Sequence, residues 1–398
     1  MRPLDMGWVV CAASPECTGS ARPPYGRCLA HLERDELGEV IRGLAPGSPV
    51  DLRGTVVGED LLEQVLTATR RTLGRARFDW ALFPDEARFG AVLFRGDASF
   101  DHAAFHRLAS FYDARFTGNV SFGEVRFARE LSLHGVTVTG HAALDRVVAG
   151  GDALFGSARF GRTSSFRHAE FRGFTSFDDA RFAGDAGFRG CRFGRTVSFH
   201  KARFDGLAGF EAVRFSARTY LTPAVTGRRL TLAGARASGA LELSAAGCPV
   251  DLRRLHASGE LTVRLQDAEV DLEEATLRGP AAVIGRGTAR VVSLRGVEAE
   301  SLELTRLDLT ACRFAGFPRP DRVRLTGCAF AAAPRGLRFP SKWPILRWWP
   351  GRRRIAEEHA WHEWSSPPAG TPADPPAGRS AAPPADPPAS APPAHLAG

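Results

Sequence analysis

Phenylalanine recurs in steps of five and six residues through the middle of the chain, from Phe78 to Phe215. A step of five does not keep to one face of an α-helix, which needs apolar residues at i, i+3, i+4 and i+7. It also departs from the period-two alternation of an ordinary strand. The spacing predicts a solenoid whose short sides each send one large residue inward. The large positions are Phe78, Phe83, Phe89, Phe94, Phe100, Phe105, Phe111, Phe116, Phe122, Phe127, Leu133, Val138, Leu144, Ala149, Phe155, Phe160, Phe166, Phe171, Phe177, Phe182, Phe188, Phe193, Phe199, Phe204, Phe210 and Phe215.

A small residue stands two positions before most of the large ones, as in Ala87 before Phe89 and Ala180 before Phe182. Residues i and i−2 of an extended segment point to the same side, so each inward face should hold one small and one large side chain. Such a pair fills a narrow core. Because steps of five and six alternate, a coil of four sides would need about 20 or 22 residues, with the extra residues at two opposite corners.

The repeat units resemble those of the pentapeptide-repeat family, in its Phe-centred form. Ala87-Arg88-Phe89 and Ala202-Arg203-Phe204 are examples. The resemblance implies a right-handed quadrilateral β-helix with four short sides per coil. We therefore expect an all-β solenoid with small helical caps and a disordered C-terminal tail.

Three cysteines and a histidine near the N-terminus have the spacing C-x5-C-x10-C-x2-H: Cys11, Cys17, Cys28 and His31. This stretch is too short to bury a core of its own, and a tetrahedral zinc ion with three thiolates and one imidazole would order it. With four protein ligands the zinc site would be closed and structural. The alternative is an incidental cluster of free thiols. Actinobacterial pentapeptide-repeat proteins carry a comparable leader that ends as Cys28 to Leu32 does, and this resemblance favours zinc.

The other four cysteines, Cys191, Cys248, Cys312 and Cys328, stand two residues before a large repeat residue, so we expect small core residues there. An odd count of seven argues against a disulfide framework.

Five segments follow from these patterns. They are a zinc module (1–31), a helical N-terminal cap with a first β-helix side (32–77), the pentapeptide-repeat β-helix (78–332), a Trp/Arg-rich cap helix (333–364) and a disordered Pro/Ala-rich tail (365–398). Helices are expected over 32–44 and 59–70, with the first β-helix side at 50–54. After Tyr220 leucine and valine replace phenylalanine, and we expect the same solenoid to continue with a thinner core.

Arginine carries nearly all of the positive charge, and the chain has a net charge of +8. From Phe116 onward every second side tends to carry arginine just before the large residue, with Glu170 as an exception, and these arginines should point outward and form columns along the stacked coils. The positions are Arg115, Arg126, Arg159, Arg181, Arg192, Arg203 and Arg214. We favour arginines that cover the surface and pair locally with acids. The alternatives are an anionic polymer and an acidic protein surface.

The motifs of the sequence favour a binding protein over an enzyme. The sequence has no Gly-rich phosphate loop, no H-E-x-x-H and no nucleophile elbow. It has no apolar run of membrane-spanning length and no signal-peptide hydrophobic region, so we expect a cytoplasmic protein.

We expect a non-catalytic scaffold that mediates protein-protein interaction with a partner protein whose identity the sequence does not reveal. One alternative is association with a membrane surface through the Trp/Arg-rich segment. Another is weak nucleic-acid binding through the arginine columns. Some pentapeptide-repeat proteins mimic DNA toward topoisomerases, but that function needs an acidic surface, so the basic charge disfavours it.

Overall fold

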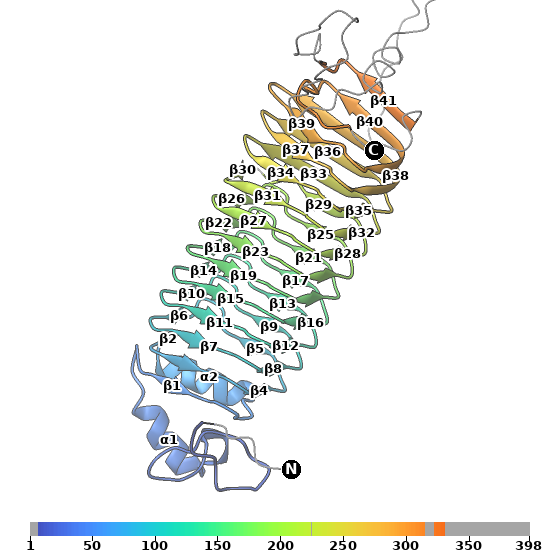
Figure 1. The fold of residues 1–398 in the computed structure, drawn as a ribbon. Coiled ribbons are helices and arrows are strands. Elements are labelled where there is room, and N and C mark those ends of the chain that lie inside the picture. Colours follow the sequence, from blue (N-terminus) through green and yellow to red (C-terminus); the bar gives the residue numbers. More distant parts are fainter. Residues whose placement is uncertain (1–6, 224, 315–321, 331–398) are drawn as a thin grey trace, which may run out of the picture. The chain divides into compact units, whose positions relative to one another are not determined.

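The computed structural model describes residues 7–223, 225–314 and 322–330. These residues form an all-β solenoid of parallel strands, and Figure 1 shows its coils stacked in sequence order from β1 to β41. The prediction of fold class is thereby confirmed. The expected cap helix (333–364) and the tail (365–398) lie outside the described residues, and the chain divides into units Met1–Ser365 and Ser366–Gly398.

Each coil of the main repeat has four short sides, named here first to fourth in chain order. The first sides form a 12-stranded sheet: β1 (Val50–Asp51), β3 (Ala76–Arg77), β7 (Ala98–Ser99), β11 (Val120–Ser121), β15 (Ala142–Ala143), β19 (Ser164–Ser165), β23 (Ala186–Gly187), β27 (Leu207–Gly209), β31 (Arg229–Thr231), β34 (Pro249–Asp251), β37 (Glu269–Asp271) and β39 (Arg290–Ser293). The fourth sides form an 8-stranded sheet: β2 (Thr72–Leu73), β6 (Leu93–Phe94), β10 (Arg115–Phe116), β14 (Thr137–Val138), β18 (Arg159–Phe160), β22 (Arg181–Phe182), β26 (Arg203–Phe204) and β30 (Val225–Thr226).

The second and third sides belong to one 21-stranded sheet. The second sides are β4 (Leu82–Phe83), β8 (Ala104–Phe105), β12 (Arg126–Phe127), β16 (Val148–Ala149), β20 (Glu170–Phe171), β24 (Arg192–Phe193), β28 (Arg214–Phe215), β32 (Arg236–Ala237) and β35 (His256–Ala257). The third sides are β5 (Ala87–Arg88), β9 (Ala109–Ser110), β13 (Leu131–Ser132), β17 (Ala153–Leu154), β21 (Thr175–Ser176), β25 (Val197–Ser198), β29 (Thr219–Leu221), β33 (Leu241–Ala246) and β36 (Leu261–Gln266). Towards the C-terminus come β38 (Thr276–Arg286), β40 (Glu298–Thr305) and β41 (Val323–Thr326), and β38 pairs with both β35 and β36.

Coil length changes along the solenoid. In the Phe-rich part, residues that pair between neighbouring coils are 22 apart in sequence, as for Ala76 and Ala98. From Leu230 to Val250 the interval falls to 20. The shortening coincides with the replacement of phenylalanine by leucine and valine. It also coincides with longer strands, which run through a position where the earlier coils have a corner. Both predicted coil lengths therefore occur, in different parts of one continuous set of sheets.

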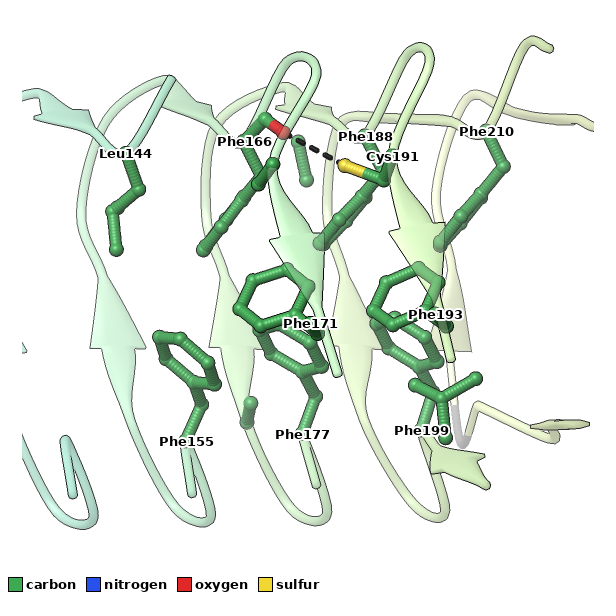
Figure 2. Close-up of a cluster of buried hydrophobic side chains, with 14 of the residues drawn as sticks. Leu144, Phe155, Phe166, Phe171, Phe177, Phe188, Cys191, Phe193, Phe199 and Phe210 are labelled. Atoms are coloured by element: carbon green, nitrogen blue, oxygen red, sulfur yellow. Dashed lines mark hydrogen bonds between the residues drawn. The ribbon is translucent and has the colours of Figure 1, made fainter. Parts of the chain in front are cut away.

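The interior is a stack of aromatic rings. All of the repeat phenylalanines are buried, and the small residue two positions earlier is buried beside most of them. Rings at equivalent positions lie parallel in successive coils, for example Phe177 with Phe155 at 4.5 Å and with Phe199 at 4.7 Å between centroids. Rings from opposite sides meet edge to face, as Phe177 does with Phe166 at 5.5 Å. Figure 2 shows these columns, and both arrangements are favoured by the ring quadrupole.

Corners after the first and third sides are tight turns. The N–H of Ala81 donates to the carbonyl of Phe78 (3.0 Å), and Trp80, the third residue of that turn, has a φ of 60°. A positive φ at the third position is the signature of a type II turn. The same conformation recurs every eleven residues, at Ala91 and His102 for example. These corners account for the steps of five, and looser bends at the other two corners account for the steps of six.

Two α-helices lie before the main repeat, α1 (Arg34–Arg42) and α2 (Glu59–Ala68), with a 3-10 helix, η1, at Leu29–His31. Both α-helices are shorter than predicted. The expected continuation of α2 to residue 70 was wrong because Arg70 and Arg71 adopt positive φ, which stops the helix. Helix α2 buries its apolar face against the solenoid, where Val65 is fully buried.

The four later cysteines divide into two pairs. Cys191 and Cys248 are buried as predicted, and the Cys191 thiol donates to the carbonyl of Phe166 at 2.7 Å (Figure 2). The prediction of core positions was wrong for Cys312 and Cys328, which are only partly buried against the core. Both lie towards the C-terminal end of the described part of the solenoid.

Candidate metal centre and outward faces

The four predicted metal ligands come together in the structure. One ligand atom from each of Cys11, Cys17, Cys28 and His31 lies within 4.8 Å of all the others. Cys11 and Cys28 are buried, Cys17 is half-buried and His31 is exposed. The chain between these residues is irregular, so the cluster depends on backbone bonds such as that from the N–H of Cys11 to the carbonyl of Gly19 (2.8 Å).

Four of the six distances between ligand atoms in this cluster are close to those of a tetrahedral metal site. Zinc–sulfur bonds of about 2.3 Å and zinc–nitrogen bonds of about 2.0 Å give tetrahedral edges of about 3.8 Å for S···S and about 3.5 Å for S···N. The Sγ atoms of Cys17 and Cys28 are 3.8 Å apart. His31 Nδ1 lies 3.3 Å from Cys28 Sγ, 3.4 Å from Cys17 Sγ and 3.6 Å from Cys11 Sγ. A disulfide would need sulfur atoms about 2.05 Å apart, so the same distances exclude a Cys17–Cys28 bridge in this arrangement.

A glycine allows the cluster to close. A Cβ at Gly19 would lie 2.7 Å from the Cβ and 2.8 Å from the Sγ of Cys28, so any other residue would push against a ligand. The next residue, Ser20, donates its N–H to the carbonyl of Arg53 (2.7 Å), and the Thr18 hydroxyl donates to the carbonyl of Gly54 (3.1 Å). These bonds attach the cluster of Cys11, Cys17, Cys28 and His31 to the first coil of the solenoid.

Side chains also tie the cluster to α1. Arg27, one residue before Cys28, donates to both carboxylate oxygens of Glu36 at 2.9 and 2.8 Å. Glu36 in turn accepts the backbone N–H of Glu33 (2.9 Å) and closes the capping box of α1. Both contacts come from Nη2 of Arg27, and hydrogen bonds between charged groups are stronger than those between neutral ones. The sequence analysis missed these supports, although a Glu three residues after the N-cap is a recognisable capping signal.

The thiols of the cluster differ in how their surroundings shift the pKa. Burial raises the pKa of the Cys28 thiol to about 12, and the neighbouring sulfur of Cys17 adds to the rise. Burial acts in the same direction on Cys11, but hydrogen bonds from the backbone of Cys28 and Ala13 and from His31 outweigh it and lower its pKa to about 7. A bound cation would remove the repulsion between thiolates, so the donor set fits a soft divalent metal.

The arginine columns predicted from the repeat exist. Arg159, Arg181 and Arg203 are in register on the fourth side, and Arg192 and Arg214 are in register on the second. All seven predicted column arginines are exposed. Within the described residues only Arg181 of these seven forms an ion pair, with Asp205 at 3.0 Å. The favoured interpretation, that these arginines pair locally with acids, thus fits one of them.

Acids at the corners have another role, which the sequence analysis missed. Asp101 accepts the hydroxyl of Ser121 and the N–H of Gly123 (2.7 Å) from the next coil. Asp145 bonds Ser165 and the N–H of Arg167 (2.8 Å) in the same way. These carboxylates satisfy corner N–H groups that no strand pairs. The signal was available as an Asp directly after a large residue, followed 20 residues later by a Ser.

Exposed aromatic side chains gather towards the N-terminal end. Trp80 is 44% exposed and stacks on His102 of the next coil with 4.3 Å between ring centroids. Tyr112 is 51% exposed and stacks on His134 at 5.6 Å. The guanidinium of Arg53 lies over the ring of Trp8, 4.8 Å from its centroid, which is a cation–π contact between the Cys-rich N-terminal segment and the first coil.

Comparison with known families agrees with the fold. Residues 100–148 and 155–203 match a family model described as pentapeptide repeats (9 copies). The interruption falls just where alanine, at Ala149, replaces the large inward residue. The chain therefore carries pentapeptide repeats over these residues. No curated protein matches it significantly, and no helix among the described residues is long and apolar enough to cross a membrane.

Proposed function

We propose that this protein is a non-catalytic β-helical scaffold that binds a partner protein, and that a structural zinc ion orders its N-terminal module. The observation that supports zinc is the tetrahedral spacing of Cys11, Cys17, Cys28 and His31. Four protein ligands leave no open coordination position, so the ion would stabilise the module and take no part in a reaction. The free cysteines favour a reducing compartment such as the cytoplasm.

The zinc content of the purified chain tests the metal. We expect about one zinc per chain by elemental mass spectrometry, and a cobalt-substituted form with the absorption bands of tetrahedral thiolate ligation. Cys28→Ser should lose the metal. Cys191→Ser is the matched control, because that cysteine is buried in the solenoid far along the chain from the cluster. Metal-free intact protein, or full zinc retention by Cys28→Ser, would show that the cluster is not a zinc site.

Protein binding is supported by where the large apolar side chains are exposed. Among the described residues those with large exposed apolar side chains are Val9, Val10, Val56, Trp80 and Tyr112, all within the first 112 positions. Aromatic residues are enriched at the centres of protein interfaces, where Trp and Tyr contribute much of the binding energy. The proposed docking surface is therefore the N-terminal end, comprising the zinc module and the corner that carries Trp80.

Affinity capture from a host-like lysate tests this surface, followed by binding of the purified pair. The intact chain is compared with Trp80→Ala and Cys28→Ser. Arg254→Ala is the control, since Arg254 occupies the equivalent corner position late in the solenoid with a similar φ of 55°. Binding lost in the first two variants and kept in the control supports the proposal. Equal binding by all four proteins would move recognition away from the N-terminal end.

A further inference from the structure

Six arginines on and beside the second side have no acidic partner. All six are exposed, and within the described residues none forms an ion pair: Arg167, Arg189, Arg192, Arg195, Arg214 and Arg236. We call this set the basic face. It occupies four successive coils, which span about 14 Å at about 4.8 Å per coil.

The centre of the basic face is a straight row. Arg192 pairs in register with Arg214, and Arg214 with Arg236, on strands β24, β28 and β32. The row begins after Glu170, whose carboxylate is already bound to Arg172 at 2.8 Å. Inward neighbours of the row are buried residues such as Phe193, so the three guanidinium groups can only extend into solvent.

Corner positions widen this row. Directly after the large residue of the first side, the earlier coils carry acids such as Asp101 and Asp145, which bond the next coil. In the following two coils the same position holds Arg167 and Arg189. At these two corners an arginine therefore stands where a carboxylate would neutralise the row. Within the four coils of the basic face, Glu211 is the only acid at this corner position.

We infer that the basic face binds the phosphate backbone of a nucleic-acid duplex without reading its sequence. This inference goes beyond the proposed protein partner and uses a different part of the solenoid. Six charges over about 14 Å is roughly one per 2.4 Å, which approaches the one charge per about 1.7 Å of duplex DNA. Arginine forks suit phosphate oxygens, and exposed arginines in register at a spacing of about 4.8 Å repel one another unless an anion lies between them.

The surroundings favour a duplex over other anions. Single-stranded nucleic acid needs aromatic platforms for its bases, and none of the outward residues of β20, β24, β28 and β32 is aromatic. An acidic protein surface would be expected to bring apolar contacts, but the exposed apolar side chains lie at the N-terminal end. Contacts with phosphate groups need only positively charged side chains long enough to extend to them, and the basic face provides such side chains.

Salt-dependent titration of a fluorescent duplex with the full chain tests the inference. If all six arginines neutralise phosphates, affinity should fall roughly 10³-fold between about 50 and about 200 mM salt. The triple variant Arg192→Gln, Arg214→Gln, Arg236→Gln should flatten the slope of log K against log salt by roughly 2 to 3. Circular dichroism of the variants checks that the β-helix remains folded.

The fourth side provides a matched control with the same loss of charge. Arg159→Gln, Arg181→Gln, Arg203→Gln removes three arginines from the same repeat position on another side, and it should leave the slope close to that of the intact chain. Equal flattening by both triple variants would reduce the effect to net charge and overturn the inference. So would a flat slope for the intact chain, or tighter binding of polyglutamate or of a single strand than of the duplex.

Discussion

Two adjacent serines on β19 should respond to alanine with opposite signs. Ser164 points inward, is fully buried, and its hydroxyl has no hydrogen-bond partner. Ser165 points outward and donates to the Asp145 carboxylate of the preceding coil. In register with Ser164, the neighbouring coils carry Ala142 and Ala186. The core therefore already accepts alanine on both sides of this position.

The magnitudes follow from these environments. A buried hydroxyl without a partner costs about 1–3 kcal/mol, and Ser164→Ala removes it while deleting only one oxygen atom. We expect Ser164→Ala to stabilise the protein by about 1 kcal/mol. A hydrogen bond to a carboxylate contributes about 1.5–3 kcal/mol, less where water competes. Ser165→Ala should therefore destabilise the protein by about 1 kcal/mol and leave the Asp145 carboxylate with its bond to the N–H of Arg167.

Hydrogen exchange is the suitable assay because each coil of a solenoid contacts only its neighbours, so effects are local. A change of about 1.4 kcal/mol alters protection of the amides in the affected coils about tenfold. Urea unfolding of the whole chain gives a second measure. Slower exchange in Ser164→Ala together with faster exchange in Ser165→Ala is the expected result. Changes of the same sign in both variants would refute the assignment of inward and outward hydroxyls.

Three further predictions concern the core, the metal module and acid stability. Phe177→Ala should lower the free energy of unfolding by about 3–5 kcal/mol, since the ring is fully buried between parallel rings at 4.5 and 4.7 Å. Phe174→Ala, at a half-buried corner, should cost much less, and equal urea midpoints for the two variants would contradict this reasoning. Gly19→Ala should abolish stoichiometric zinc binding, because the new Cβ would lie 2.7 Å from a ligand side chain; a variant with full zinc content would disprove the close contact. Burial acts to raise the pKa of Asp251, but hydrogen bonds from Arg253 outweigh it and lower that pKa. Its stabilising contribution is thus present above the unfolded pKa of about 4 and is lost as the pH falls through the lower folded value. Asp251→Asn should remove this part of the acid dependence, which unfolding measured from neutral to acidic pH would detect as a flatter profile.

The repeat determined much of the fold in advance, because local spacing and long-range contact coincide in a solenoid. Each phenylalanine contacts its equivalent in the next coil, so a pattern with a step of five or six defines the core directly. The clustering of Cys11, Cys17, Cys28 and His31 was predictable for a similar reason, since Cys28 and His31 are only three residues apart and their side-chain chemistry limits the remaining candidates. Residues whose place follows from side-chain type and local spacing could therefore be predicted from the sequence.

Features that depend on which distant residues lie side by side in neighbouring coils could not be predicted from the sequence. Whether Arg192 has an acidic neighbour depends on which residue lies 22 positions away, and coil length was uncertain from the spacing alone. Towards the C-terminus, Leu and Val replace phenylalanine, and β38 straightens across a former corner. The same loss of pattern hid the partial exposure of Cys312 and Cys328. Helix ends were misjudged because Arg70 and Arg71 take positive φ, a conformation that sequence rarely reveals outside glycine.

The zinc module and the basic face should act independently. In the 12-stranded sheet six strand steps separate β1, beside the module, from β23 in the coil of Arg192, which is about 29 Å at about 4.8 Å per step. Coils of a solenoid transmit stability mainly to their neighbours. Cys28→Ser should thus release zinc and loosen the first coil while the duplex titration keeps its slope. If duplex affinity instead fell in proportion to zinc content, the nucleic acid would contact the N-terminal end, and the assignment of two separate surfaces would be wrong.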